Sequence, residues 1–172
     1  EPYRESAAKI ASDPADAVGQ SPLTVICIDD YAASTAVLES PGMQAVLNDR
    51  VIVQLSTGTP GDARSLCEKV AAAGAGYLDG AVLAYPREVG HDALIAISGD
   101  EAVYDAHEKT LGALSTDVRF LGNAVGASAA LDVAVLSYYS LSHLGLVHAA
   151  LICEAEQVAP EVLTGVLVDS LP

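Results

Sequence analysis

Compact runs of apolar, mostly β-branched residues alternate along this chain with stretches of helical periodicity. The apolar runs predict strands at residues 24–29, 51–56, 76–84, 93–99 and 118–122. The periodic stretches predict helices at residues 31–47, with a break at Pro41, and at 60–73 and 100–114. Strands that alternate with helices indicate a mainly parallel sheet with crossover helices, which is the α/β class.

Capping signals support two of the predicted helix starts. Asp13 and Pro14 are typical of the N-cap and the first position of a short helix, which Gly19 would end. Thr59 and Pro60 give the same signal directly after the second predicted strand.

The character of the chain changes at Gly126, where about 30 residues can form one helix that is apolar nearly all round. Such a helix is roughly 45 Å long at ~1.5 Å per residue, and a domain of this size cannot cover it. We expect it to meet a second domain or another subunit. Asn123 to Val125 is therefore the predicted boundary between domains 1–124 and 125–172, and Pro160 opens a further helix.

Part of this helix could be mistaken for a membrane span. Residues 133–153 contain no Asp, Glu, Lys or Arg, and the run is long enough to cross a bilayer. However, it holds His143 and His148 and has no basic anchor at either end. We interpret it as a buried helix of a protein that does not bind a membrane.

Composition narrows the possible partners and the cellular location. Apolar residues make up 51% of the chain, and 23 acidic against 8 basic residues give a net charge of -15, which disfavours nucleic acid and anionic lipid. Cys27, Cys67 and Cys153 are odd in number and lack metal-ligand spacing, so we expect reduced core thiols in a cytoplasmic protein. The start at Glu1 has no basic region or cleavage site, so we expect a cut or renumbered chain and not an exported one.

Polar residues follow two of the predicted strands. Ser56 and Thr57 lie where a strand ends and a helix begins, which is where ligands bind in open α/β sheets, although simple turn and capping roles explain them equally well. Asp79 is either a site carboxylate or a turn residue. Tyr85 and Pro86 either line a pocket or pack at a strand end.

Asp132 is the only charged residue between Gly126 and Cys153. At ~100° per residue, Ser128, Tyr139 and His143 lie within roughly 40° of it and form one polar stripe. A lone carboxylate is costly to bury, so this stripe requires a cleft, a partner or a ligand. The alternative is an Asp satisfied by another subunit or by the first turn of its own helix.

The remaining histidines, His91, His107 and His148, have no spacing that indicates a metal site, and we interpret them as surface or packing residues. A dinucleotide-binding domain normally opens with a strand, G-x-G-x-x-G and a helix, and this chain has no such motif. The run at residues 24–29 is similar to a later strand of such a sheet, so we expect the cofactor loop upstream of Glu1. The alternative is a complete chain that binds no nucleotide.

Several segments together resemble the imine reductase branch of the β-hydroxyacid dehydrogenase superfamily, which includes 6-phosphogluconate and 3-hydroxyisobutyrate dehydrogenases. They are "VICIDDY", "VIVQLSTGTP", "GYLDGAVLAYP", "AISGDEAVY" and "GASAALDVAVLSYYSLSHLGLVHAALICEAE", and the resemblance extends over residues 21–157. It implies a Rossmann-like, mainly parallel sheet, here without its first strands, and a long interdomain helix that opens an all-α C-terminal domain. It also implies an intertwined homodimer and NADPH as cofactor.

The resemblance also separates two chemistries. Members that oxidise hydroxy acids carry a Lys on the long helix, an Asn one turn later and a glycine-rich "DAPVSGG" segment; the matching positions are Asp132, Leu136 and residues 79–86. A Lys pairs with an anionic substrate, whereas Asp132 would repel it and attract a cationic iminium. In an apolar site, Asp132 would also have a raised pKa and could donate a proton.

The resemblance assigns the site residue by residue. Asp132 would be catalytic, the cofactor would contact Cys27, Ile28, Asp29, Ser56 and Thr57, and the substrate would contact Leu83, Ala84, Tyr85 and Tyr139. The segment that reads the 2′-phosphate has no counterpart here, so NADPH over NADH is a family expectation. The implied function is NADPH-dependent reduction of imines to amines; the alternatives are a hydroxyacid dehydrogenase relative and a non-catalytic truncated member.

Overall fold

A computed structural model of the protein describes residues 8–170. The chain forms two compact units, Glu1–Val133 and Ala134–Pro172, and their border falls inside helix α6 (Ala127–Ala155). The beginning of α6, including Asp132, therefore belongs to the first unit. The boundary at 123–125 marks a change in sequence character and stays a prediction.

The first unit is built on one sheet in the order β1-β2-β3-β4-β5. Its strands are β1 (Leu23–Ile26), β2 (Val51–Gln54), β3 (Gly76–Leu83), β4 (Leu94–Gly99) and β5 (Asp117–Phe120). The pairs β1–β2, β2–β3 and β4–β5 are parallel, while β4 runs antiparallel to β3. Between β3 and β4 stands only the short 3₁₀ helix η2 (Pro86–Glu88), and a parallel crossover needs a longer connection. The predicted α/β fold with a mainly parallel sheet is confirmed.

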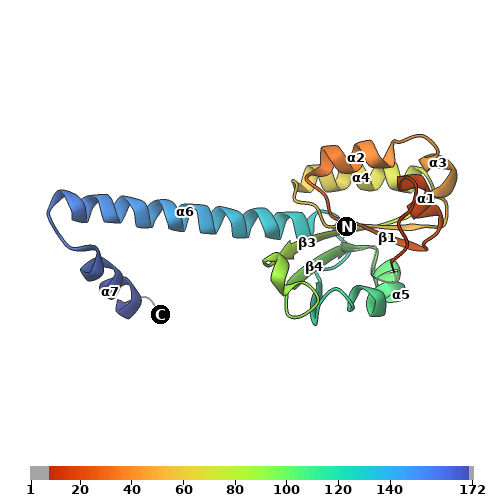
Figure 1. Ribbon diagram of the computed structural model, residues 1–172. Coiled ribbons are helices and arrows are strands. Elements are labelled where there is room, and N and C mark those ends of the chain that lie inside the picture. Colours follow the sequence, from red (N-terminus) through yellow and green to blue (C-terminus); the bar gives the residue numbers. More distant parts are fainter. Residues whose placement is uncertain (1–7, 171–172) are drawn as a thin grey trace. The chain divides into compact units, whose positions relative to one another are not determined.

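Helices cover both faces of this sheet, as Figure 1 shows. One face carries α1 (Pro14–Gly19), α2 (Tyr31–Leu38), α3 (Met43–Val46) and α4 (Pro60–Ala72), and the other carries α5 (Glu101–Leu111). The predicted break near Pro41 separates α2 from α3, and the Thr59 side chain caps α4 in a capping box with Asp62. The predicted helix starts at Asp13 and Thr59 are thus confirmed.

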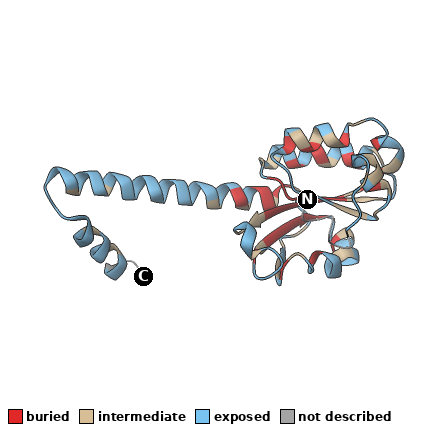
Figure 2. Ribbon diagram, in the orientation of Figure 1, coloured by how far each residue is buried: buried red, intermediate tan, exposed pale blue. Residues whose placement is uncertain are grey.

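The alternation of side chains along the strands gives the first unit two cores. Ile52 and Tyr77 pack under α2 and α4, whereas Val53, Leu78 and Ile97 pack toward α5. In Figure 2 the central strands are buried accordingly. β1 and β2 end earlier than predicted, at Ile26 and Gln54, so the residues that follow leave the sheet as loops.

This early end corrects the expectation for the cysteines. All three are free, but Cys27 is exposed because it follows the last residue of β1, and Cys67 and Cys153 are only partly buried. The prediction of core thiols is therefore wrong for Cys27.

The second unit contains the rest of α6 and α7 (Pro160–Ser170). Leu141, Leu144 and Leu151 on α6 are 68%, 65% and 56% exposed, so the expectation of a buried helix is not met within the described chain (Figure 2). The physical reason is length, since α6 has 29 residues and few elements to cover them. Among residues 8–170, α6 is the one helix long and apolar enough to cross a membrane, a property that core helices of soluble proteins share.

Candidate functional site

The loops that follow β1 and β2 lie side by side, because the two strands are parallel and Ile26 pairs with Gln54. They border a cavity of about 390 Å³ at the carboxyl ends of these strands. Its lining includes Cys27, Ile28, Asp29, Ser56 and Thr57, together with apolar residues of the β3–β4 region. All five residues predicted to contact the cofactor therefore line one cavity, at the position where open α/β sheets bind ligands.

Ser56 holds the two loops together. Its side chain is buried, and the backbone N–H of Ile28 donates to its Oγ at 3.0 Å. The Ser56 N–H in turn donates to Oε1 of Gln54 at 3.2 Å. The hydroxyl thus fixes the loop that carries Ile28, a role that the sequence did not reveal.

Asp132 lies beside the same cavity. It is only 7% exposed, and a hydrogen bond joins its carboxyl to the side chain of Thr57, which lines the cavity. Burial raises the pKa of Asp132 above its usual range, and the hydrogen bond from Thr57 partly offsets that rise. This direction agrees with the one expected for an apolar site, and the carboxyl can hold a proton at higher pH than an exposed Asp.

Asp79 is not the turn residue that was one of its two possible roles. It lies inside β3 and is fully buried, so the turn assignment is wrong, and it does not line the cavity, so its role as a site carboxylate stays a prediction. The Tyr31 hydroxyl donates to its Oδ1 at 2.6 Å, and the backbone N–H of Ala129 donates to its Oδ2 at 3.2 Å. Asp79 therefore binds the beginning of α6, a contact across fifty positions that no local pattern indicates.

The residues expected around the substrate are only partly brought together. Ala84 lines the cavity, as does Pro86, whereas Leu83 and Tyr85 do not. Tyr85 is 66% exposed and the guanidinium of Arg87 lies 4.9 Å from the centre of its ring. Tyr139 belongs to the second unit, where it is 56% exposed.

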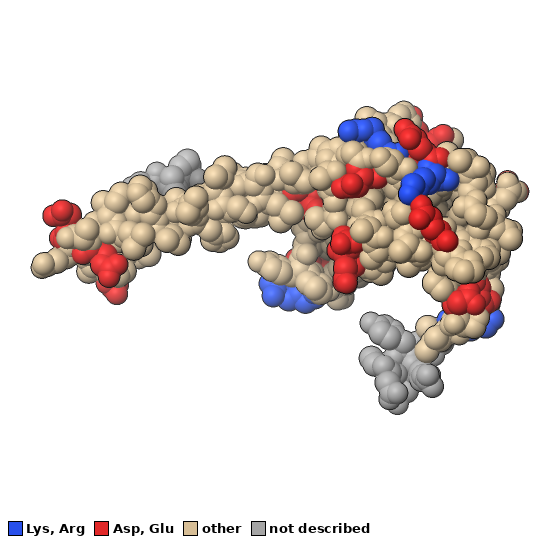
Figure 3. Space-filling view, turned by 90° about the horizontal axis from the view of Figure 1, so that it is seen from above, with Lys and Arg blue, Asp and Glu red and all other residues tan. Residues whose placement is uncertain are grey.

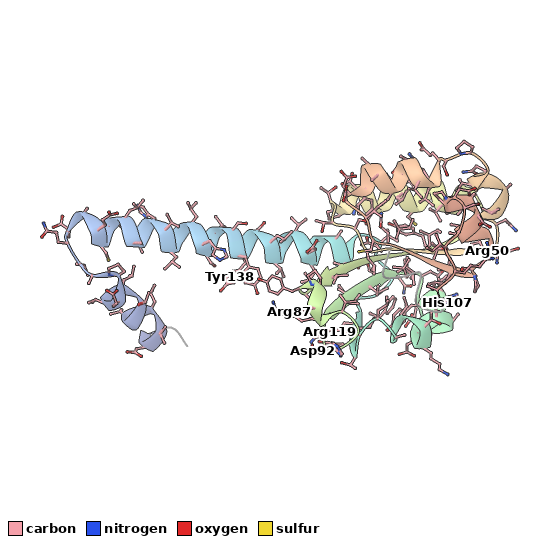
Figure 4. All side chains as sticks on the ribbon, viewed as in Figure 1. Arg50, Arg87, Asp92, His107, Arg119 and Tyr138 are labelled. Atoms are coloured by element: carbon pink, nitrogen blue, oxygen red, sulfur yellow. The ribbon has the colours of Figure 1, made fainter. Side chains whose placement is uncertain are left out.

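The residues that line the cavity are acidic or uncharged. Within residues 8–170 its lining contains Asp29 but no Lys or Arg. Figure 4 shows Arg50, which directly precedes β2, and there it donates to the carbonyl of Gly19 at 3.1 Å. Acidic side chains outnumber basic ones on the face in Figure 3. The described lining suits a neutral or cationic group better than a phosphate.

A metal site requires several ligating side chains close together. Across the described part of the chain, no group of three or more His, Cys, Asp or Glu side chains could hold a metal ion.

The sequence and the fold resemble known reductases over nearly the whole chain. A NADPH-dependent reductive aminase from Aspergillus oryzae is 30% identical over 170 residues, which is 96% of this chain and 56% of that protein. An imine reductase variant from Myxococcus stipitatus in complex with NAD+ is 31% identical, with a TM-score of 0.90 over 96% of this chain and 57% of that one. An imine reductase from Aspergillus terreus in complex with NADPH4 and dibenz[c,e]azepine is 30% identical, with a TM-score of 0.86 over 99% and 59% of the two chains.

The chain thus spans little more than half the length of these relatives. The family described as the NAD binding domain of 6-phosphogluconate dehydrogenase matches residues 1–122. This match covers the sheet, its helices and the loops that line the cavity. The chain belongs to the family of the NAD binding domain of 6-phosphogluconate dehydrogenase.

Proposed function

We propose that the whole protein uses NADPH to reduce imines or iminium ions to amines. The observation that carries this proposal is the buried Asp132 carboxyl beside a cavity at the carboxyl ends of β1 and β2. Relatives that are similar over nearly the whole chain are named imine reductases and a reductive aminase, which supports the same chemistry.

The lining of the cavity fits the nicotinamide end of the cofactor. Ile28 and the apolar wall suit an aromatic ring, and the exposed Thr57 offers a hydroxyl to a ribose. Asp29 and Asp132 disfavour phosphate, so the pyrophosphate would be held elsewhere. When bound, NADPH supplies the hydride.

Asp132 would act on the nitrogen of the substrate. Its ionised form attracts a cationic iminium by about 4 kcal/mol at ~4 Å and an effective dielectric constant of ~20. With a neutral imine, the protonated carboxyl that the raised pKa keeps available would donate its proton to the substrate nitrogen, and the resulting iminium, paired with the Asp132 carboxylate, would accept the hydride at carbon. The same negative charge repels the carboxylate of a hydroxy acid. The charge of the substrate therefore distinguishes imine reduction from hydroxy-acid oxidation, the two reactions of the superfamily.

We also propose that the protein works as a cytoplasmic homodimer. The apolar side chains of the second unit, among them Leu141 and Val168, are 68% and 78% exposed, and soluble monomers rarely leave such patches uncovered. Free cysteines suit a reducing compartment. Light scattering on the whole protein tests the dimer, and a stable monomer at micromolar concentration would contradict it.

The function is tested with matched substrates on the whole protein. We expect oxidation of NADPH with a cyclic imine and no reduction of NADP+ with an anionic β-hydroxy acid. Faster turnover of the hydroxy acid than of the imine would contradict the proposal and would indicate a hydroxyacid dehydrogenase instead. Absence of turnover together with absence of NADPH binding by calorimetry would indicate a non-catalytic protein.

A further inference from the structure

A layer of buried polar side chains crosses the sheet beneath α2 and α4. Gln54 pairs with Asp79 and Asp79 pairs with Ser98, so the three side chains lie in register on one face. All three are fully buried. A buried polar group without a hydrogen-bond partner is costly. The hydrogen-bond partners of these side chains therefore indicate what the layer does.

The partners of Asp79 and Ser98 are the first residues of α6. The Ser128 Oγ lies 2.7 Å from the Ser98 Oγ and donates to the carbonyl of Asp79 at 2.9 Å. The Ser128 N–H donates to the Ser98 Oγ at 3.2 Å, and the Ala129 N–H donates to the Asp79 carboxylate, also at 3.2 Å. The free amides of a helix start are thus satisfied by two strands. A carboxylate at this end is also favoured by the helix dipole.

These contacts determine where Asp132 lies. Asp132 follows Ser128 by four positions, so the two side chains project from the same side of α6. Both are buried. Because β3 and β4 hold Ser128 and Ala129, the next turn presents Asp132 to Thr57.

Tyr31 connects the same carboxylate to the loop that carries Thr57. Its hydroxyl donates to Asp79 at 2.6 Å, and burial raises its pKa so that it stays a donor. Its ring lies against Gly58, where an added Cβ would be 2.6 Å from Cε2. Tyr31 therefore touches Asp79 with its hydroxyl and the residue after Thr57 with its ring.

We propose that Tyr31 and Asp79 are a positioning pair that sets the contact between Asp132 and Thr57. Both side chains are buried and neither lines the cavity, so each would act through the residues that it holds. Asp79 holds the beginning of α6, Tyr31 supports the loop, and their shared hydrogen bond ties the two together. The effect on turnover rests on the proposed function, whereas the effect on α6 does not.

Three substitutions separate positioning from general stability. Tyr31→Phe keeps the ring against Gly58 and removes only the hydroxyl. Asp79→Asn keeps the shape but replaces one acceptor oxygen with a donor. Tyr104→Phe is the matched control, because Tyr104 is a buried tyrosine on the other sheet face, stacked on Phe120 at 4.6 Å between ring centres.

Amide hydrogen exchange on the whole protein is the first measurement. We expect the amides of residues 128–132 to exchange roughly tenfold faster in Tyr31→Phe and in Asp79→Asn, with a smaller change in the rest of the sheet. Tyr104→Phe should leave them unchanged. Unchanged exchange in Tyr31→Phe, or an equal rise at all amides of the first unit, would overturn the proposal; if Asp79→Asn does not fold, Tyr31→Phe alone decides.

Steady-state turnover of a cyclic imine is the second measurement. We expect kcat of Tyr31→Phe to fall roughly tenfold with a shifted basic limb in its pH profile, because activity that needs protonated Asp132 is lost as pH rises, while the Kd for NADPH changes less than about twofold. An unshifted profile and an unchanged kcat would overturn the pair's role in turnover. If the unmodified protein reduces no imine, the proposed function fails, and the exchange result still decides whether the pair positions α6.

Discussion

Tyr31 packs closely against Gly58, the residue after Thr57. A substitution at Gly58 therefore measures how much this close packing contributes to the free energy of unfolding. A methyl group at Gly58 would overlap Cδ2 of Tyr31 and lie 2.6 Å from Cε2 and 3.1 Å from Cγ. Ordinary carbon contacts are about 3.5 to 4.0 Å, so the ring or the loop must move by about 1 Å. The ring cannot simply swing out, because it is only 6% exposed and its hydroxyl binds Asp79.

We therefore expect Gly58→Ala to reduce the free energy of unfolding by about 2 to 4 kcal/mol. Overpacking accounts for about 1 to 3 kcal/mol of this, and weakening of the hydrogen bond to the Asp79 carboxylate accounts for the rest. Because the clash is with Tyr31, the same substitution in a Tyr31→Leu background should cost less than about 1 kcal/mol.

Urea denaturation of the four proteins in this cycle is the assay. Gly61→Ala is the control, since a Cβ at Gly61 meets only the Thr59 Oγ1 at 3.5 Å in the first turn of α4. It should be neutral or stabilising by up to about 1 kcal/mol. A cost of Gly58→Ala below about 0.5 kcal/mol, or an equal cost in the Tyr31→Leu background, would refute the proposed packing.

Three further predictions concern the first unit. Gly126→Ala should destabilise it by about 1 to 3 kcal/mol in urea denaturation, because Gly126 has a φ of 93° and an added Cβ would lie 2.9 Å from the carbonyl oxygen of Pro60. Thr59→Ala removes the capping box of α4 and should cost about 1 kcal/mol, seen as a lower Tm by circular dichroism. Burial raises the pKa values of Asp79 and Asp132, so the contribution of these two groups to stability is fully present below their unfolded pKa of ~3.9 and is lost as pH rises through their folded pKa values. Asp132→Asn should therefore reduce that loss in isothermal denaturation as pH is raised above the unfolded pKa of ~3.9, and an unchanged slope would contradict the assignment.

Much of the fold could be predicted from the sequence because its signals are local. Apolar runs and capping residues such as Asp13 and Thr59 identified the strands and the helix starts of the first unit. The ends of β1 and β2 were less certain, since Leu55 and Cys27 extend the apolar runs beyond the last paired residues. The exposure of Cys27 was missed for that reason.

The candidate site was predictable where one residue stood out from its surroundings. Asp132 is such a residue, because it is an isolated charge on an apolar helix, and its burial and raised pKa agree with that interpretation. The role of Asp79 could not be read in the same way. Its partners Tyr31 and Ala129 are 48 and 50 positions away, and Tyr31 looks like an ordinary apolar residue at a helix start.

The account depends most on Asp132, and single-turnover hydride transfer in the whole protein tests it most directly. The substrate is a cyclic imine, the variants are Asp132→Ala and Asp132→Asn, and melting temperature and NADPH affinity are measured in parallel. We expect Asp132→Ala to slow hydride transfer by about 10² to 10⁴-fold, with little change in Tm or NADPH affinity, and Asp132→Asn to fall between it and the unmodified protein. A lower Tm in both variants with an unchanged rate per folded molecule would contradict the catalytic assignment.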